Sequence, residues 1–275
     1  MAGLSDADVA RYREDGFVFP VPAIAAGEAA DLLAWLDDLE ARHADLDAKA
    51  RRHRLLRFKP HVRYTRLDRV VHHPAILDAV EHLIGPDILV WASAFFIKDA
   101  RDPAFVSWHQ DSATYGLDGT DLVTAWIAVT PAGPGNAGMR FAPGTHRAGP
   151  CAHRDTEAPD NMLSRGETVE LAIDERAAVD VVLAPGEMSL HHIDLAHSSL
   201  ANGSDSRRIG YAVRYFTPTM RPRRGEASAM LARGRDRHGH FTLEPRPRAD
   251  DDPAALAAWQ TALDLRERAV FGEAS

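Results

Sequence analysis

Hydrophobic positions follow two different periods along the chain, and the period changes near residue 86. Up to that point apolar residues recur every three or four positions, which is typical of amphipathic helices. The stretch 5–15 begins at Ser5, a good N-cap, and stops at Gly16, and a short strand is predicted after it at 17–20. Two further helices are predicted over 27–46 and 73–86.

From residue 88 onward the apolar runs are short and rich in β-branched and aromatic residues, with Gly, Pro and Asn between them. This composition predicts strands over 88–98, 121–130, 139–146, 168–173, 177–192 and 208–216. Because no helical pattern interrupts them, an antiparallel sandwich or barrel is expected. A last helix is predicted over 252–271. The predicted fold is therefore mainly β with flanking α-helices that cover one face of the β-structure.

The chain contains no internal repeat and no low-complexity linker. We therefore predict a single domain over 1–275, with a helical N-terminal cover at about 5–85, a β core at about 86–220 and a C-terminal extension with a helix at about 221–275.

Composition excludes several classes of protein. With 45% hydrophobic and 26% charged residues in 275 positions, the chain has the composition of a globular protein. Its formal net charge of -8 argues against nucleic-acid binding. The start lacks the pattern of a secretion signal, and no apolar run is long enough to span a membrane. The single cysteine, Cys151, cannot form an intramolecular disulfide, so a cytoplasmic location is expected.

Positive charge is concentrated in two places. Residues 51–69 contain eight Arg or Lys and residues 221–248 contain eight Arg, which is half of the 32 basic residues of the chain. Local positive charge raises the concentration of anions at a cleft, and this favours an anionic ligand. Equally, these arginines can pair with the excess of acids in the protein itself.

The stretch "WHQD" contains His109 and Asp111, two positions apart. In a strand, residues i and i+2 point to the same face, so the imidazole and the carboxylate would emerge side by side as two metal ligands. On its own this pair is weak evidence, because polar residues alternate along the exposed face of many ordinary strands. A third ligand is needed for a firm metal site.

Three histidines, His191, His192 and His197, lie close together after the turn "APGE". They form either a metal-binding loop or an ordinary polar segment. His191 and His192 are adjacent, so they would point to opposite faces of a strand. Arg208 follows His197 by eleven residues, at the start of a predicted strand, where a guanidinium could hold a carboxylate through two hydrogen bonds.

The order of these motifs resembles the phytanoyl-CoA dioxygenase family, whose members are non-haem iron(II) oxygenases that depend on 2-oxoglutarate. The resemblance rests on "WHQD", "TAWIAV", "GNAGMRFAPGTHR", "APGEMSLHH" and "HSSLANGSDSRRIGYAVRY", in this order, and extends from about residue 5 to residue 217. Chance agreement of one such motif is common, whereas agreement of five in sequence is not.

The resemblance implies a double-stranded β-helix, the cupin-like jelly-roll barrel, with Fe(II) held by His109, Asp111 and His197. It also implies that the far carboxylate of 2-oxoglutarate pairs with Arg208 and Ser199. Further family positions that line the cosubstrate pocket are matched by Gln110, Trp126 and His192.

The implied reaction consumes O2 and 2-oxoglutarate, releases succinate and CO2, and hydroxylates an unactivated C–H bond of a small molecule. Since an aspartate is retained at position 111, where related halogenases have a small residue, halogenation is not expected. Desaturation, epoxidation and ring closure are other outcomes of the same chemistry.

The substrate is expected to be a small, anionic metabolite. Candidate substrate contacts are Lys98, which follows an apolar strand, and Arg63, Tyr64 and Arg66, which lie in the first basic stretch. A register slip by one residue would exchange Arg208 for Arg207 in the cosubstrate pocket. The oligomeric state is not predicted.

Two alternatives belong to other functional classes. A non-catalytic jelly-roll protein that binds a metal or a ligand could keep the same fold, because fold alone does not decide function. Such a protein would have little use for Arg208 and Ser199. A zinc hydrolase built on the same ligands would need a glutamate base nearby, and the sequence has no evident one.

Overall fold

A computed structural model describes residues 3–156, 158–163 and 165–271. Its helices are α1 (Asp6–Asp15), α2 (Ala26–Arg42), α3 (Ala48–Leu56), η1 (Pro60–Val62), α4 (Thr65–Val71), α5 (Pro74–Ile84), α6 (Ser112–Tyr115), η2 (Pro134–Asn136), η3 (Thr145–Ala148) and α7 (Pro253–Phe271). Its strands are β1 (Phe17–Pro22), β2 (Ile88–Lys98), β3 (Val106–His109), β4 (Leu117–Asp118), β5 (Leu122–Ala128), β6 (Met139–Phe141), β7 (His153–Arg154), β8 (Thr168–Val169), β9 (Val179–Asp180), β10 (Glu187–His192), β11 (His197–Ser199), β12 (Arg208–Phe216), β13 (Arg221–Pro222), β14 (Ser228–Arg233) and β15 (Thr242–Leu243).

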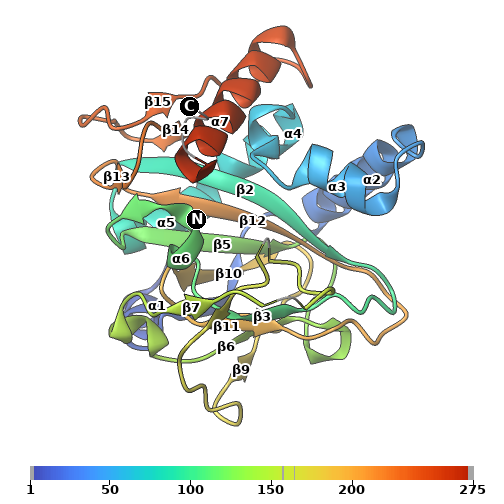
Figure 1. Cartoon of the computed structure of the whole chain (residues 1–275), viewed down its shortest axis with the longest axis vertical. Helices are drawn as coiled ribbons and strands as arrows, with labels where there is room; N and C mark the ends of the chain where they lie inside the picture. The colour runs from blue at the N-terminus through green and yellow to red at the C-terminus, as the bar shows by residue number, and fades with distance from the viewer. Residues whose placement is uncertain (1–2, 157, 164, 272–275) are drawn as a thin grey trace.

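Two sheets form the centre of the molecule. The larger has the order β1-β10-β5-β12-β2-β14-β15, and the smaller has the order β3-β11-β6-β9. All neighbouring strands are antiparallel except β14 and β15. Figure 1 shows the small sheet below the large one, with most of the helices above. The prediction of a mainly β jelly-roll type fold with flanking helices is confirmed.

Alternation along β12 separates two faces of the large sheet. Ile209, Tyr211 and Val213 belong to the core that the large sheet forms with the helices. Ala212 belongs to the core between the two sheets, together with Trp126 of β5. Since residues two apart share a face, Arg208 and Arg214 of the same strand point inward, between the sheets.

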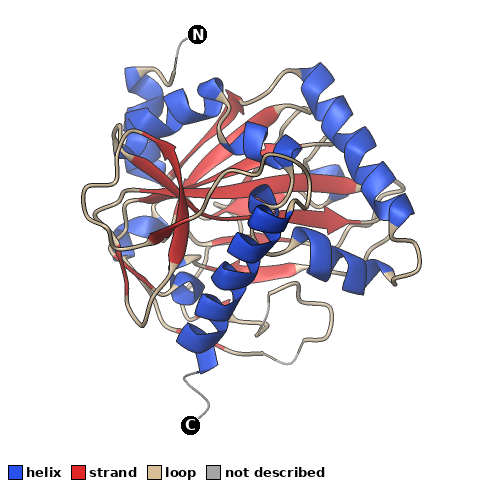
Figure 2. Cartoon of the chain, turned by 90° about the horizontal axis from the view of Figure 1, so that it is seen from above, coloured by secondary structure: helices blue, strands red, loops and turns tan. Residues whose placement is uncertain are grey.

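The helices cover the outer face of the large sheet. In α2 the buried positions Leu32, Leu36 and Leu39 follow the predicted three- and four-residue spacing. Ser5 and Asp8 form a capping box at the start of α1, and Gly16 ends this helix with a left-handed φ of 87°. Figure 2 shows the helices around the outside of the strands. None of the helices in the described ranges is long and apolar enough to cross a membrane.

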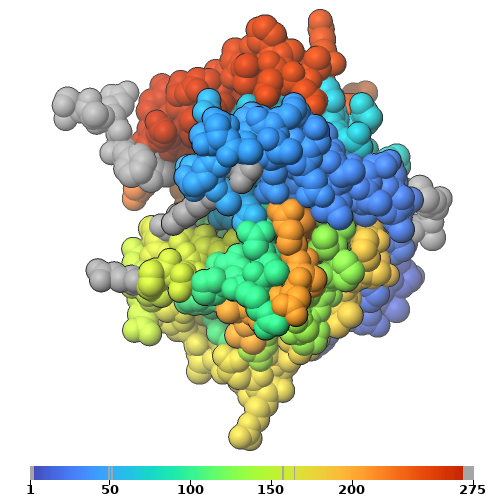
Figure 3. Space-filling view, turned by 90° about the vertical axis from the view of Figure 1, so that its right-hand side faces the viewer, coloured from blue at the N-terminus to red at the C-terminus, as the bar shows by residue number. Residues whose placement is uncertain are grey.

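The C-terminal segment packs against the helical N-terminal part, as the space-filling view shows at one pole of the molecule (Figure 3). Lys59 forms a buried ion pair with Glu244 at 2.5 Å and also donates to Ser228. Arg246 pairs with Asp68 at 2.6 Å. These members of the two basic stretches therefore pair with acids of the chain itself and join its two ends.

Several predicted boundaries are wrong. The strand predicted over 168–173 is reduced to β8, and the one over 139–146 ends at Phe141, because Pro143 and Gly144 begin a turn. Helices α3 and α4 were not predicted. Both segments are short and contain several charged residues, so their apolar period is weak.

Candidate metal centre and its surroundings

Strands β3 and β11 hold two histidines opposite each other. His109 ends β3, His197 begins β11, and the two are partners in the antiparallel register. Their ring centroids lie 4.1 Å apart. Together with Asp111 they offer three ligand atoms that lie within 4.8 Å of one another, and all three residues are buried. The structure therefore brings the three predicted metal ligands to one point.

Asp111 reaches this point by a turn and not by strand alternation. The expectation that His109 and Asp111 lie on one face of a single strand is wrong, because β3 ends at His109. Asp111 has helical backbone angles (φ -60°, ψ -31°) and precedes the short helix α6. Its carboxylate accepts a hydrogen bond from Thr124 on β5 at 3.1 Å, and its other oxygen lies 3.7 Å from Nε2 of His109.

Each histidine is oriented by a backbone carbonyl two residues before it. His109 donates from Nδ1 to the carbonyl of Ser107, and His197 donates from Nδ1 to the carbonyl of Leu195, both at 2.9 Å. This fixes the tautomer, so that both Nε2 atoms carry lone pairs available to a metal. Two imidazoles and one carboxylate that converge from one side are a ligand set that fits Fe(II) and leaves coordination positions open on the other side.

The charge states of these groups also suit a metal. Burial alone would raise the pKa of Asp111, but the nearby His109, His197 and Arg214 hold that pKa well below its usual value. Burial, with His109 and His191 nearby, lowers the pKa of His197 well below its usual value. A carboxylate and a neutral imidazole are the forms that bind a divalent cation.

A second group of polar residues lies along the inner face, around Arg208. Lys98 is the register partner of Arg208 on β2 and donates from Nζ to Oγ of Ser199 at 2.8 Å and to the carbonyl of Leu200. The guanidinium of Arg208 lies 5.4 Å from the ring centre of Trp126. A Cβ on Gly210 would lie 1.8 Å from that ring, so only glycine fits there.

Arg208 is buried without a counter-ion. It is 2% exposed, and none of its nitrogens donates a hydrogen bond to a residue that the structure describes. Burial lowers its pKa to about 10, and burial and Arg208 together lower the pKa of Lys98 to about 7. An unpaired buried guanidinium is costly, so this end of the inner face fits the carboxylate of a ligand.

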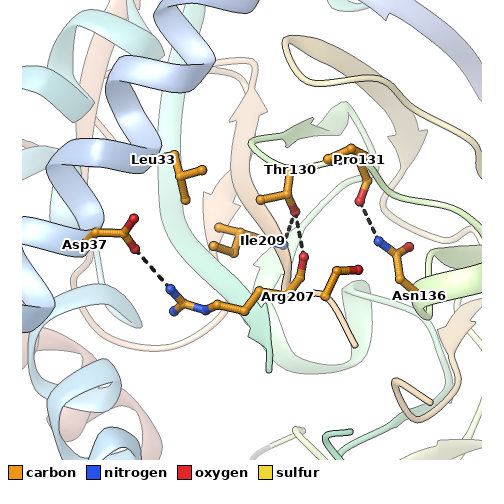
Figure 4. Close-up of a pocket in the computed structure, with 8 residues that line it drawn as sticks. Leu33, Asp37, Thr130, Pro131, Asn136, Arg207 and Ile209 are labelled. Atoms are coloured by element: carbon orange, nitrogen blue, oxygen red, sulfur yellow. Dashed lines mark hydrogen bonds and ion pairs between the residues drawn. The ribbon is translucent and has the colours of Figure 1, made fainter. Parts of the chain in front are cut away.

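The neighbouring Arg207 faces the opposite way. It pairs with Asp37 at 3.1 Å and with Asp99 at 3.1 Å beside a surface cavity of about 360 Å³, where its carbonyl accepts a hydrogen bond from Thr130 (Figure 4). This cavity lies against the outer face, because Ile209 and Leu33 line it. Arg207 is therefore not an alternative to Arg208 between the sheets.

Two of the predicted cosubstrate contacts lie elsewhere. The amide of Gln110 is fully used by the backbone, since it donates to the carbonyls of Gly149 and Asp194 and accepts from the amide of Cys151. His192 lies on the outer side of β10, where its ring is 5.2 Å from that of His146 and 6.3 Å from that of Tyr12. The structure does not bring either side chain to the ligand cluster.

His191 lies on the inner side in place of His192. Its ring centroid is 4.8 Å from that of His197, and neither of its nitrogens has a hydrogen-bond partner in the described part of the chain. Burial lowers its pKa to about 4. Alternation along a strand requires the two adjacent histidines to face opposite ways. It does not determine which of the two faces inward.

The predicted substrate contacts in the first basic stretch lie in the helical cover. Arg63 pairs with Asp251 at 2.7 Å. Tyr64 is buried there and packs edge-on against Trp35 at 5.3 Å. Arg66 precedes Leu67, a buried residue of the same core. None of the three lies beside the metal ligands.

Four other residues near the ligands were not predicted. Arg214 donates from Nε to the hydroxyl of Tyr115 at 2.7 Å; Arg214 is buried, Tyr115 is partly buried, and both interact electrostatically with Asp111. Arg214 and Arg57 each lie over the ring of Phe96, at 5.4 and 4.8 Å from its centre. The six-residue spacing from Arg208 to Arg214 in a predicted strand was the available signal, because it puts both on one face.

Comparison with known proteins agrees with this geometry. The model of the family described as phytanoyl-CoA dioxygenase (PhyH) matches residues 12–210. A curated relative from Stutzerimonas stutzeri, "Probable alpha-ketoglutarate-dependent hypophosphite dioxygenase", is 31% identical over 56% of this chain and 55% of its own. "1-deoxypentalenic acid 11-beta-hydroxylase" from Streptomyces arenae is 32% identical over 52% of each chain. The matched region thus spans about half the length of these relatives.

Solved structures match over nearly the whole chain. The structure "non-heme monooxygenase; ThoJ apo" is 42% identical, with a TM-score of 0.84 over 94% of this chain and 96% of its own. The structure "CytC3 with Fe(II) and alpha-ketoglutarate" is 22% identical, with a TM-score of 0.67 over 90% of this chain and 96% of its own. At that identity the second match supports the fold alone.

Proposed function

Because the chain belongs to the phytanoyl-CoA dioxygenase family, we propose that it is an Fe(II)- and 2-oxoglutarate-dependent oxygenase that hydroxylates a C–H bond of a small organic acid. In this reaction R–H, 2-oxoglutarate and O2 give R–OH, succinate and CO2. One oxygen atom enters the alcohol and the other enters succinate. We propose that the whole chain works as one catalytic unit.

One observation carries the proposal: three ligand atoms within 4.8 Å of one another share an interior with a buried, unpaired guanidinium. His109, Asp111 and His197 would hold Fe(II), and the metal when bound supplies the redox chemistry that activates O2. Thr124 and the carbonyls of Ser107 and Leu195 orient these ligands.

The cosubstrate would lie between the metal and Arg208. The far carboxylate of 2-oxoglutarate would receive hydrogen bonds from Arg208 and a charge contribution from Lys98, which Ser199 holds in position. The ring of Trp126, beside the guanidinium of Arg208, would close one side of the cosubstrate site. Burial excludes water there, so the charged hydrogen bonds are stronger than they would be at the surface.

Hydroxylation of an acid is the favoured reaction for two reasons. The names of two curated relatives are those of a probable hypophosphite dioxygenase and of a 1-deoxypentalenic acid hydroxylase; hypophosphite is an anion and the second substrate is a carboxylic acid. Asp111 fills the third ligand position of the protein, so no coordination position is freed for a halide. Hydroxylation therefore requires only that the substrate is bound with one C–H bond directed at the metal.

The test is an anaerobic titration with Fe(II) and then 2-oxoglutarate, followed by the weak visible charge-transfer band of the chelate. The band should form in the wild type and fail to form in His109→Ala. Arg208→Ala should need far more 2-oxoglutarate to reach the same absorbance. A wild-type protein that binds iron without this band would be a non-catalytic metal-binding jelly roll, and the proposal would be wrong.

A further inference from the structure

Three arginines from three distant segments lie close to one another, since the charges of Arg214 and Arg266 both act on Arg57. Arg57 follows α3, Arg214 lies on β12, and Arg266 lies on α7. Six residues of strand separate Arg208 from Arg214, which is about 20 Å. The metal ligand Asp111 lies at the Arg214 end, because Thr124 is the register partner of Arg214 and also donates to Asp111. Arg214 and Arg57 both lie over the ring of Phe96, so the inner face has a second cationic group besides Arg208.

We propose that Arg57 and Arg214 bind the acidic group of the substrate, beside the aromatic rings of Phe96 and Tyr115. This inference rests on the proposed function, since it assigns the substrate side of the same centre. It also assigns the substrate class: an organic acid with an apolar body, whose oxidised carbon lies between its acidic group and the metal.

Arg214 is available to a ligand because its contacts in the protein are few. The side chain is 8% exposed, and its Nε donates to Tyr115 at 2.7 Å. A terminal nitrogen reaches the carbonyl of Ala212 only at 3.5 Å, near the limit of a hydrogen bond. The remaining donors have no partner in the described residues, so a planar carboxylate could take two of them.

Arg57 reaches the same place from the helical cover. Its guanidinium lies 4.8 Å from the centre of the Phe96 ring, and its one hydrogen bond to a described residue goes to the carbonyl of Met162 at 3.3 Å. Burial, together with Arg214 and Arg266, lowers the pKa of Arg57 to about 10, which is still far above neutral pH. Two positive groups thus contact one ring, although like charges repel.

The absence of an ion pair is what points to a ligand, although the metal ligand Asp111 acts on Arg214 from a greater distance. Within the described ranges, no Asp or Glu oxygen lies within 4.0 Å of Arg57, Arg214 or Arg266. Other arginines of the same two stretches have such partners: Arg52 pairs with Asp99 at 2.8 Å and Arg63 pairs with Asp251 at 2.7 Å. Arg214 is buried, Arg57 is half-buried and Arg266 is exposed. A buried charge without an ion-pair partner is costly, so an anion from outside would complete the site at Arg214 and Arg57.

The aromatic groups indicate what the rest of the ligand is like. Arg266 lies over the ring of Phe58 at 5.2 Å, and Arg214 lies over Tyr115 at 5.7 Å. Rings beside guanidinium groups provide apolar contact area next to the charges. An inorganic anion would leave this area unused, whereas a carboxylic acid with a hydrocarbon body would cover it.

The test uses octanoate and octanamide, which differ in charge but little in shape. The protein is loaded with Ni(II), which imidazole and carboxylate ligands also bind, and saturated with 2-oxoglutarate, so that binding is measured without turnover. Affinities are obtained by ligand-observed NMR. Wild type should bind octanoate at least about tenfold more tightly than octanamide, and Arg57→Gln and Arg214→Gln should each weaken octanoate about five- to tenfold with octanamide unchanged.

Arg63→Gln is the matched control, because Arg63 belongs to the same basic stretch but already has a carboxylate partner. The ratio of its octanoate affinity to its octanamide affinity should equal that of wild type. Thermal unfolding checks each variant, and Arg57→Gln alone decides if Arg214→Gln does not fold. Equal affinities for the two probes in wild type, no saturable octanoate binding, or a ratio unchanged in Arg57→Gln overturns the inference. If the charge-transfer band forms but octanoate is not preferred over octanamide, the proposed substrate site is wrong and the oxygenase proposal stands. If octanoate is preferred but the band does not form, the oxygenase proposal is wrong.

Discussion

The two faces of the large sheet hold charged side chains in opposite ways. On the outer face, Arg207 is paired with Asp37 and Asp99, and in the helical cover Arg63 is paired with Asp251. On the inner face, Arg208 has no partner in the described residues, and Arg214 has only the hydroxyl of Tyr115 as a close one. The paired cations join segments of the chain, whereas we propose that the unpaired ones bind ligands.

This difference has an energetic cost that ligands can offset. Exposed ion pairs stabilise a protein by about 0–1 kcal/mol, so the outer pairs matter mainly for local geometry. A buried polar or charged group without a partner costs more, and a ligand that binds only the folded state returns that free energy on binding. In the proposed function, the unpaired cations of the inner face therefore lower the stability of the empty protein and raise its affinity for anionic ligands.

The largest expected effect is on iron binding, and it distinguishes His197 from His191, two histidines that both face inward. His197→Ala should weaken iron binding at least about 100-fold, since it removes a ligand and not only a group behind one. His191→Leu should keep the iron, because His191 is not part of the cluster of three ligand atoms. Iron content after gel filtration measures both. Equal loss in the two variants would mean that His191 is a ligand and that the assignment of the cluster is wrong.

The next effect compares the two adjacent arginines. Arg208→Gln should raise the dissociation constant of 2-oxoglutarate about 100-fold, which corresponds to about 2.7 kcal/mol for a lost buried charge pair. Arg207→Gln, a matched substitution one residue away, should leave this constant within about twofold of wild type, because its partners lie on the outer face. Titration of the chelate band gives both values. The opposite ranking would place Arg207 inside.

Sequence patterns predicted the sheet core and the three ligands better than they predicted the surroundings of the ligands. Strands β2, β5 and β12 are long and strongly apolar, so their period is clear. The turn that carries Asp111 into position was not predicted, since the spacing H-x-D is equally compatible with a strand. Residues near the ligands were misassigned wherever the choice depended on which face of a strand points inward, as for His192 and His191.

The basic stretches show a different limit of sequence reasoning. From composition alone, Arg57 and Arg63 are equivalent members of one cationic segment. They differ only in tertiary contacts: Asp251, almost 190 positions further along the chain, reaches Arg63, while no carboxylate of the described residues reaches Arg57. Which cations are free for a ligand is decided by the C-terminal segment, and no local pattern predicts how that segment packs.

A smaller effect depends on pH and on Lys98. Burial and Arg208 lower the pKa of Lys98 to about 7, so it loses its proton as pH rises through that value. A dicarboxylate favours the protonated form, and affinity for 2-oxoglutarate should therefore fall about tenfold between about pH 6.5 and 8.5. Lys98→Met should bind more weakly at the lower pH and lose most of this dependence. A wild-type affinity that is constant over this range would exclude Lys98 from the cosubstrate pocket.

The smallest effect tests the paired side of the comparison. Arg63→Gln removes an ion pair with the half-exposed Asp251 and should lower the free energy of unfolding by less than about 1 kcal/mol. Because Arg63 lies in the helical cover, iron content and 2-oxoglutarate affinity should be unchanged. Urea unfolding and the chelate titration measure the two quantities. A change in 2-oxoglutarate affinity as large as that of Arg208→Gln would show that Arg63 also contributes to cosubstrate binding. Pairing with a carboxylate would then not distinguish the cations that stabilise the fold from those that bind ligands.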